Sequence, residues 1–105
     1  MTDVVLIYST FPSLEDARRI AEDAVESRYA ACANIFPGVQ SIYEYNNEFS
    51  NTTENMVIFK TTKAKQDAAI AHIKHLHPFD EPALLAVPIT GGDPAYLNWI
   101  ARQTA

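Results

Sequence analysis

The sequence contains too few basic residues for a typical nucleic-acid-binding protein. It carries 8 lysines and arginines against 13 aspartates and glutamates, and its formal net charge at pH 7 is −5. No basic cluster is longer than the pair Arg18-Arg19. Binding to phosphate-rich surfaces depends on Lys and Arg side chains that neutralise the phosphates. We therefore expect neither nucleic acid nor an anionic membrane as a partner.

Cysteines and long apolar runs are equally scarce. The single cysteine, Cys32, cannot form a disulfide within the chain. The start of the sequence, Met1-Thr2-Asp3, lacks the charged and apolar regions of a signal peptide, so we expect a reducing compartment, most simply the cytoplasm. The longest apolar run, residues 83–89, is far shorter than the roughly 20 residues that a membrane-spanning helix needs.

Motifs of known catalytic sites are missing as well. The sequence has no Cys-x-x-Cys, no His-Glu-x-x-His, no glycine-rich phosphate loop and no nucleophile elbow. No nucleophile can be paired with a general base, so we expect the protein not to be an enzyme.

What the sequence does contain is enough apolar material for one compact domain spanning residues 1–105, since 48% of its residues are hydrophobic. Hydrophobic periodicity predicts four strands and three helices. The expected strands are residues 4–8, 28–45, 56–59 and 83–89; the expected helices begin after Ser13, Thr62 and Asp93, and the second ends at His77.

Capping residues mark the predicted helices. Ser13 and Asp16 form a capping box, and Arg28 would supply a basic end that suits the helix dipole. Thr62 can cap the second helix, and Asp93 caps the third.

The stretch 28–45 predicts one unusually long strand, bent rather than ended at Pro37-Gly38. A polar stretch at residues 50–55 then predicts a wide hairpin tip before the next strand. The second half of the long strand, which contains Ile42, Tyr43 and Tyr45, projects past the region that the few helices of this chain can cover. We therefore expect a second copy of the chain to cover this aromatic face.

The order of the elements predicts an α+β fold. Strand, helix, strand, strand, helix and strand form a ferredoxin-like βαββαβ sandwich, to which the sequence adds a C-terminal helix. In this arrangement the first and third strands are central. Pro37 and Pro88 fall on the predicted edge strands, where a missing backbone donor is tolerated.

Five residues are candidates for a functional site. His77 ends a helix before a proline, so its ring can bind the last helical carbonyls or point into an adjoining cleft. Asp80 and Glu81 offer carboxylate ligands beside it. Cys32, flanked by alanines, is either a small buried residue or a soft-metal ligand. Lys60 stands at the end of a strand, where its side chain either extends into solvent or binds an anion.

Two more histidines, His72 and His75, stand three residues apart on a helix; they either chelate a cation or lie on a solvated face.

We predict weak Cu(II) binding centred on His77 with help from the carboxylates, because copper stands highest in the usual order of divalent affinities. If Cys32 is buried, its thiol is protonated and hard to reach, which argues against Cys32 as the residue through which a metal ion enters. Such binding should fade below the histidine pKa of about 6.5.

Several short motifs, in order along the chain, resemble those of the CutA divalent-cation tolerance proteins. They are residues 28–35, Pro37-Gly38 with Ser41-Ile42-Tyr43, Lys60-Thr61-Thr62, His77-Pro78-Phe79 with Pro82, Pro88-Ile89, and Tyr96-Leu97-Asn98-Trp99. The resemblance implies a cytoplasmic homotrimer of ferredoxin-like subunits, similar to the signalling protein PII. It further implies a non-catalytic protein that binds copper or other divalent metal ions and takes part in the response to metal ion.

The sequence departs from this family pattern at three places. Glu44-Tyr45 stands where members commonly have a tryptophan pair or Tyr-Trp, and Phe79 stands where tyrosine is usual. Members assigned a copper site have a cysteine and paired histidines where this chain has Ser9, Leu76 and His77.

An alternative function is a PII-like trimeric signalling or scaffold protein that binds a small metabolite or a partner protein in the inter-subunit cleft.

Overall fold

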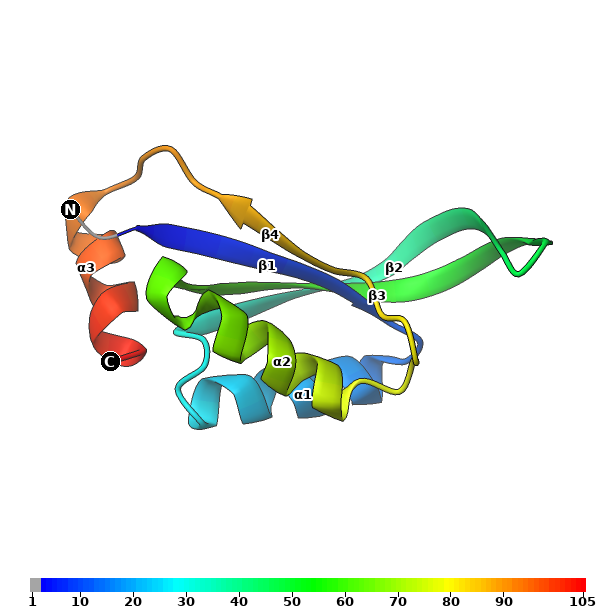
Figure 1. Ribbon diagram of the computed structural model, residues 1–105, viewed down its shortest axis with the longest axis horizontal. Helices are drawn as coiled ribbons and strands as arrows, with labels where there is room; N and C mark the ends of the chain where they lie inside the picture. The colour runs from blue at the N-terminus through cyan, green and yellow to red at the C-terminus, as the bar shows by residue number, and fades with distance from the viewer. Residues whose placement is uncertain (1–2) are drawn as a thin grey trace.

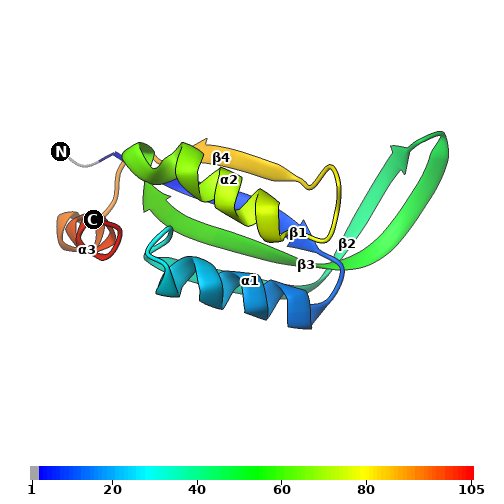
Figure 2. The same ribbon diagram turned by 60° about the horizontal axis from the view of Figure 1, so that its bottom comes forward.

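The computed structural model describes residues 3–105 as a four-stranded antiparallel sheet with two helices packed on one face (Figure 1 and Figure 2). The elements are β1 (Val4–Phe11), α1 (Leu14–Glu26), β2 (Cys32–Tyr45), β3 (Glu48–Thr62), the 3-10 helix η1 (Lys63–Lys65), α2 (Gln66–Leu76), β4 (Leu84–Pro88) and α3 (Pro94–Gln103). The strand order is β2-β3-β1-β4, which puts β1 and β3 in the centre. This confirms the predicted ferredoxin-like α+β fold.

The core lies between the sheet and helices α1 and α2. Ile7 of β1 and Phe59 of β3 are paired in register and fully buried, and Ile20 of α1 and Ile73 of α2 close over them. Helix α3 packs separately at one end of the sheet, where Ile100 belongs to a smaller cluster. Among residues 3–105, the helices are too short or too polar to cross a membrane.

Two of the predicted helix caps are confirmed. The backbone N–H of Asp16 donates to Ser13 Oγ at 3.0 Å, and that of Tyr96 donates to Asp93 Oδ2 at 3.0 Å. The capping role of Thr62 is wrong, because the chain passes first through η1 and the Thr62 side chain makes no capping hydrogen bond. The basic helix end is also wrong, since α1 stops at Glu26 before Arg28 is reached.

The long bent strand is present but begins later than predicted. Arg28 has a left-handed φ of 64°, so the chain turns there and β2 starts only at Cys32. The predicted bend is confirmed: the pairing of β2 with β3 shifts by one residue between Pro37 and Val39, and Gly38 has a φ of 81°. Glycine tolerates this backbone angle, which side chains disfavour.

The hairpin tip is tight, so the prediction of a wide polar tip is wrong. Asn46 and Asn47 alone separate β2 from β3, and both adopt the left-handed conformation that a two-residue turn requires. The polar residues 50–55 belong to β3 and pair with β2 across the whole ribbon. Gln40 Nε2, for example, donates to Thr53 Oγ1 at 3.0 Å.

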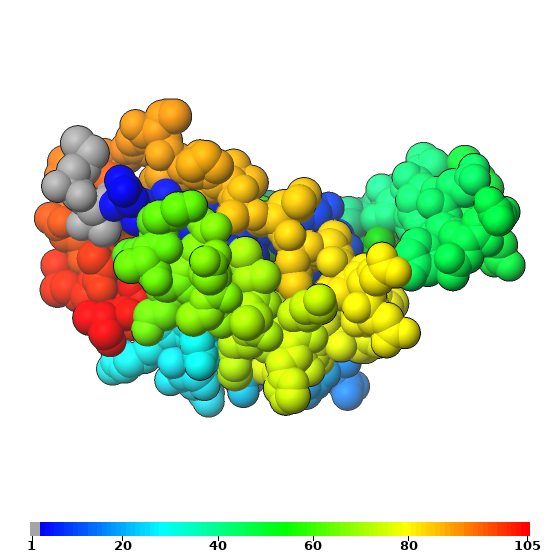
Figure 3. Space-filling view, viewed as in Figure 1, coloured from blue at the N-terminus to red at the C-terminus, as the bar shows by residue number. Residues whose placement is uncertain are grey.

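The hairpin of β2 and β3 projects from the body of the molecule. It gives the chain its long axis, with extents of 44 × 26 × 22 Å, and it stands clear of the other elements in the space-filling view (Figure 3). Apolar side chains remain uncovered on it: Ile42 is 64% exposed and Phe49 is 75% exposed. A single chain therefore leaves apolar surface of this ribbon in contact with solvent.

Candidate functional site

The residue at the end of α2, His77, lies inside the protein with both ring nitrogens in use. Its Nε2 donates to the backbone carbonyl of Thr10 at the end of β1, at 2.9 Å. Its Nδ1 accepts a hydrogen bond of 3.1 Å from the backbone N–H of Phe79, which places the ring proton on Nε2. The ring also stacks on Phe11 with centroids 4.5 Å apart. His77 thus joins β1 to the loop that follows α2.

Burial lowers the pKa of His77 below the usual histidine range. The hydrogen bond to the Thr10 carbonyl and the negative charges of Asp16 and Glu54 oppose this effect without overcoming it. The ring is therefore neutral at neutral pH. A neutral imidazole is a metal ligand, but this ring would have to give up a backbone hydrogen bond to coordinate an ion.

The two predicted carboxylates, Asp80 and Glu81, lie exposed on the loop between α2 and β4. Oε1 of Glu81 accepts a hydrogen bond of 2.9 Å from the hydroxyl of Tyr45, at the end of β2. This hydrogen bond, followed by the negative charge of Glu81, raises the pKa of Tyr45. The loop carboxylates are consequently accessible, and one of them already has a partner on the hairpin.

The histidine pair of α2 does not share one environment. His72 contacts Oδ1 of Asp23 on α1 through Nε2, and its ring stacks on Tyr29 with centroids 4.2 Å apart. The interpretation of His72 as part of a solvated face is therefore wrong, because its side chain is half-buried against Asp23 and Tyr29. His75 is exposed, as the solvated-face alternative predicted.

Cys32 and Lys60 lie opposite each other in the register of β2 and β3. Cys32 is half-buried rather than buried, and its Sγ lies 3.9 Å from Oδ1 of Asn34. Lys60 does not extend freely into solvent, because its Nζ donates to the hydroxyl of Tyr96 on α3 at 3.1 Å. Sequence reasoning missed Tyr96 as a site residue. The only signal was its place in the motif Tyr96-Leu97-Asn98-Trp99.

The predicted metal ligands are not gathered into one set. Across residues 3–105, no group of three or more His, Cys, Asp or Glu side chains is placed to hold a metal ion. Cys32 stands beside Lys60 on the sheet, whereas the His77 ring is packed under the loop that carries Asp80 and Glu81. The residues of one chain therefore do not fit a preformed closed metal site, and the ligand set stays a prediction.

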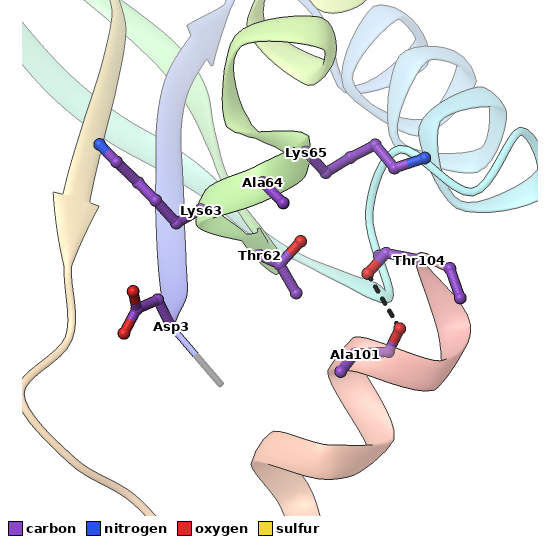
Figure 4. Close-up of a pocket in the computed structure, with 8 residues that line it drawn as sticks. Asp3, Thr62, Lys63, Ala64, Lys65, Ala101 and Thr104 are labelled. Atoms are coloured by element: carbon purple, nitrogen blue, oxygen red, sulfur yellow. Dashed lines mark hydrogen bonds between the residues drawn. The ribbon is translucent and has the colours of Figure 1, made fainter. Parts of the chain in front are cut away.

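A hollow of about 590 Å³ lies elsewhere, between the start of β1, η1 and the end of α3 (Figure 4). It is lined by Asp3, Thr62, Lys63, Ala64, Lys65, Ala101, Thr104 and Ala105. The side chains of Lys63 and Lys65 extend in different directions, and Thr104 Oγ1 donates to the helix carbonyl of Ala101 at 3.4 Å. The polar groups do not converge on a common point, so this hollow is not the candidate site.

Comparison with known proteins extends over almost the whole chain. The sequence profile of the CutA1 divalent ion tolerance protein family matches residues 5–103. The divalent-cation tolerance protein CutA of Thermus thermophilus is 42% identical over 104 residues, which are 99% of each chain. Its counterpart from Pectobacterium atrosepticum is 36% identical, over 95% of this chain and 91% of the relative. The chloroplastic CutA of Arabidopsis thaliana is 34% identical over 95% of this chain, which spans only 55% of that longer relative.

Solved structures agree with the sequence comparison. CutA from Xylella fastidiosa superposes with a TM-score of 0.96 at 36% identity, covering 99% of this chain and 100% of its own. The divalent cation tolerance protein from Thermus thermophilus superposes with a TM-score of 0.89 at 42% identity over the full length of both chains. By sequence and by structure, this chain belongs to the CutA1 divalent ion tolerance protein family.

Proposed function

We propose that the chain is a non-catalytic divalent-cation tolerance protein that binds copper or another divalent cation weakly. The observation that supports this function is the family match over residues 5–103. Relatives from Thermus thermophilus and Pectobacterium atrosepticum carry the name divalent-cation tolerance protein. These names favour cation tolerance over the PII-like signalling alternative.

Weak binding follows from the positions of the candidate ligands. Asp80 and Glu81 are exposed, so their oxygens are the accessible ligands for a divalent cation. His77 would join them only by losing its bond to Thr10 or to Phe79, and that loss subtracts from the binding free energy. Copper stands highest in the divalent affinity order and so should bind best among such ions.

We further propose that the protein works as a homotrimer, as the family resemblance implies. The uncovered hairpin supports assembly, because Ile42 and Phe49 expose most of their apolar surface in the single chain. Covering such surface stabilises an assembly by about 25 cal/mol for each Å² removed from water. The face of β4 adds Leu85, which is 60% exposed, to the surface that a second copy can cover.

A cytoplasmic location remains part of the proposal, and it rests on the single free cysteine, Cys32. Relatives are named for other compartments: the Arabidopsis protein is chloroplastic, and one from Archaeoglobus fulgidus is described as periplasmic.

A growth assay tests the tolerance function. Cells that have lost their own CutA are given this chain or an empty vector, and growth is followed over rising copper and zinc concentrations. We expect the chain to raise the metal concentration that arrests growth, and the double variant Asp80→Asn, Glu81→Gln to raise it less. Identical growth with chain and vector, at verified protein levels, would refute the proposal.

A further inference from the structure

Helices α1 and α2 cover one face of the sheet and leave the other open (Figure 2). Strand alternation places Lys60 of β3 on the open face. Its neighbour in sequence, Phe59, is fully buried on the helix-covered face, and successive side chains of a strand point to opposite faces. Strand register places Cys32 of β2 and Leu6 of β1 directly beside Lys60. Lys60 is half-buried, and neither of these two neighbours on the adjoining strands is charged.

Helix α3 completes the surroundings of this lysine. Nζ donates to the Tyr96 hydroxyl at 3.1 Å and lies 5.3 Å from the centre of the Tyr96 ring. The Tyr96 ring is itself stacked on Trp99, with centroids 5.6 Å apart. The ammonium is therefore held in place by Tyr96 of another element, whose ring is in turn supported by Trp99, rather than moving freely as surface lysines do.

No carboxylate neutralises Lys60 within residues 3–105. The ion pairs of this part of the chain join Arg19 to Asp16 and His72 to Asp23. Lys60 shares this lack of a carboxylate partner with other cations, such as Lys63, but its Nζ is held by a residue of another element. The ammonium therefore has one polar partner, the Tyr96 hydroxyl, and room beside it for an anion.

The unused hydrogen-bonding capacity at this position consists of donors. A lysine ammonium has three N–H groups, and Tyr96 takes one of them. Because the Tyr96 oxygen accepts that bond, its own O–H remains free to donate. The hydrogen bond to Tyr96 raises the pKa of Lys60 against the opposing effect of burial, so the ammonium stays charged at neutral pH. Fixed N–H and O–H donors beside a positive charge match the lone pairs of an oxyanion.

We propose that Lys60 and Tyr96 form a binding site for a small oxyanion, a molecule that bears a phosphate or carboxylate group. The Tyr96–Trp99 stack borders the site, and Leu6 is its apolar neighbour in the register of β1. The site goes beyond cation tolerance and requires no metal ion. If a second copy covers this face, one of its carboxylates could supply the same chemistry.

Trp99 is the single tryptophan of the chain and stacks on Tyr96, so its fluorescence reports on the surroundings of this site. Purified protein is titrated with inorganic phosphate, and separately with acetate, at constant ionic strength. We expect a saturable change in Trp99 emission that is lost in Lys60→Met, which keeps an apolar stem but no charge. Tyr96→Phe should weaken binding several-fold, and Lys63→Met, at an exposed lysine outside the site, should leave it unchanged.

The outcomes separate the two sources of the anion. Saturable binding lost in Lys60→Met but kept in Lys63→Met identifies a free oxyanion. No response to either anion, combined with weakened self-association in Lys60→Met alone, identifies a carboxylate of a second copy. An equal response in Lys60→Met and wild type, or neither effect, overturns the proposal. Should Lys60→Met fail to fold, Tyr96→Phe carries the same test, because it removes one hydroxyl. Failure of copper binding would leave these results unaffected.

Discussion

The hydroxyl of Tyr45 donates a hydrogen bond of 2.9 Å to Oε1 of Glu81, across 36 residues of sequence. The donor lies at the end of β2 on the projecting hairpin, and the acceptor lies in the loop between α2 and β4. The contact therefore joins the hairpin to the loop that carries the candidate carboxylates. A cation that binds Glu81 would compete with Tyr45 for the same oxygen.

Replacing Glu81 by glutamine should change the titration of Tyr45. The carboxylate raises the pKa of Tyr45 through the hydrogen bond and through its charge. Without that charge, the phenol should lose its proton at a lower pH. NMR of ring-labelled tyrosine would measure the shift, with Tyr43 as an internal control on the same strand. An unchanged Tyr45 titration in Glu81→Gln would show that the contact does not persist in solution.

Protonation of His77 should destabilise the protein in mild acid. Its pKa in the folded chain lies below the unfolded value of about 6.5, because burial disfavours the charged ring. The folded state thus prefers the neutral form. Stability is complete above about pH 6.5 and falls as the pH drops from there toward the folded-state pKa, below which the loss levels off.

Urea unfolding between about pH 7.5 and pH 5 measures this effect above the range in which most carboxylates titrate. His77→Gln retains a donor for Thr10 and an acceptor for Phe79 but cannot take up a proton. We expect this variant to lose most of the pH dependence and His75→Gln, at the exposed histidine, to retain it. The same pH dependence in His77→Gln as in wild type would contradict the account.

Features that depend on local sequence were predictable. Ser13 and Asp93 cap helices because a short polar side chain can reach backbone groups two or three residues along. The bend near Pro37-Gly38 follows from a missing donor and a permissive backbone. These signals, with the order of the elements, were enough to predict the ferredoxin-like fold.

The hairpin tip was not predictable from periodicity. Residues 50–55 lie on a ribbon that projects from the body, so the sequence there does not alternate between apolar and polar residues. The contacts of the candidate site residues could not be predicted for a different reason. The contacts of Lys60 with Tyr96 and of Tyr45 with Glu81 each join residues 36 positions apart, and tertiary packing alone creates them.

Assembly should depend on the apolar residues of the hairpin. In sedimentation velocity we expect wild type to sediment as a trimer and the double variant Ile42→Ser, Tyr43→Ser to shift toward smaller species, because it removes exposed apolar surface. Val25→Ser, at a partly exposed position on α1, is the matched control and should still assemble. A wild-type monomer at every concentration would rule out the proposed homotrimer.

Equilibrium dialysis against Cu(II) tests the central claim most directly. We expect binding that rises gradually with free Cu(II) and is reversed by a stoichiometric chelator. It should decrease in Asp80→Asn, Glu81→Gln and in His77→Ala, and it should survive Cys32→Ser. A Cu(II) ion held tightly by each chain against excess chelator, and lost in Cys32→Ser, would reveal a closed thiolate site and contradict the account.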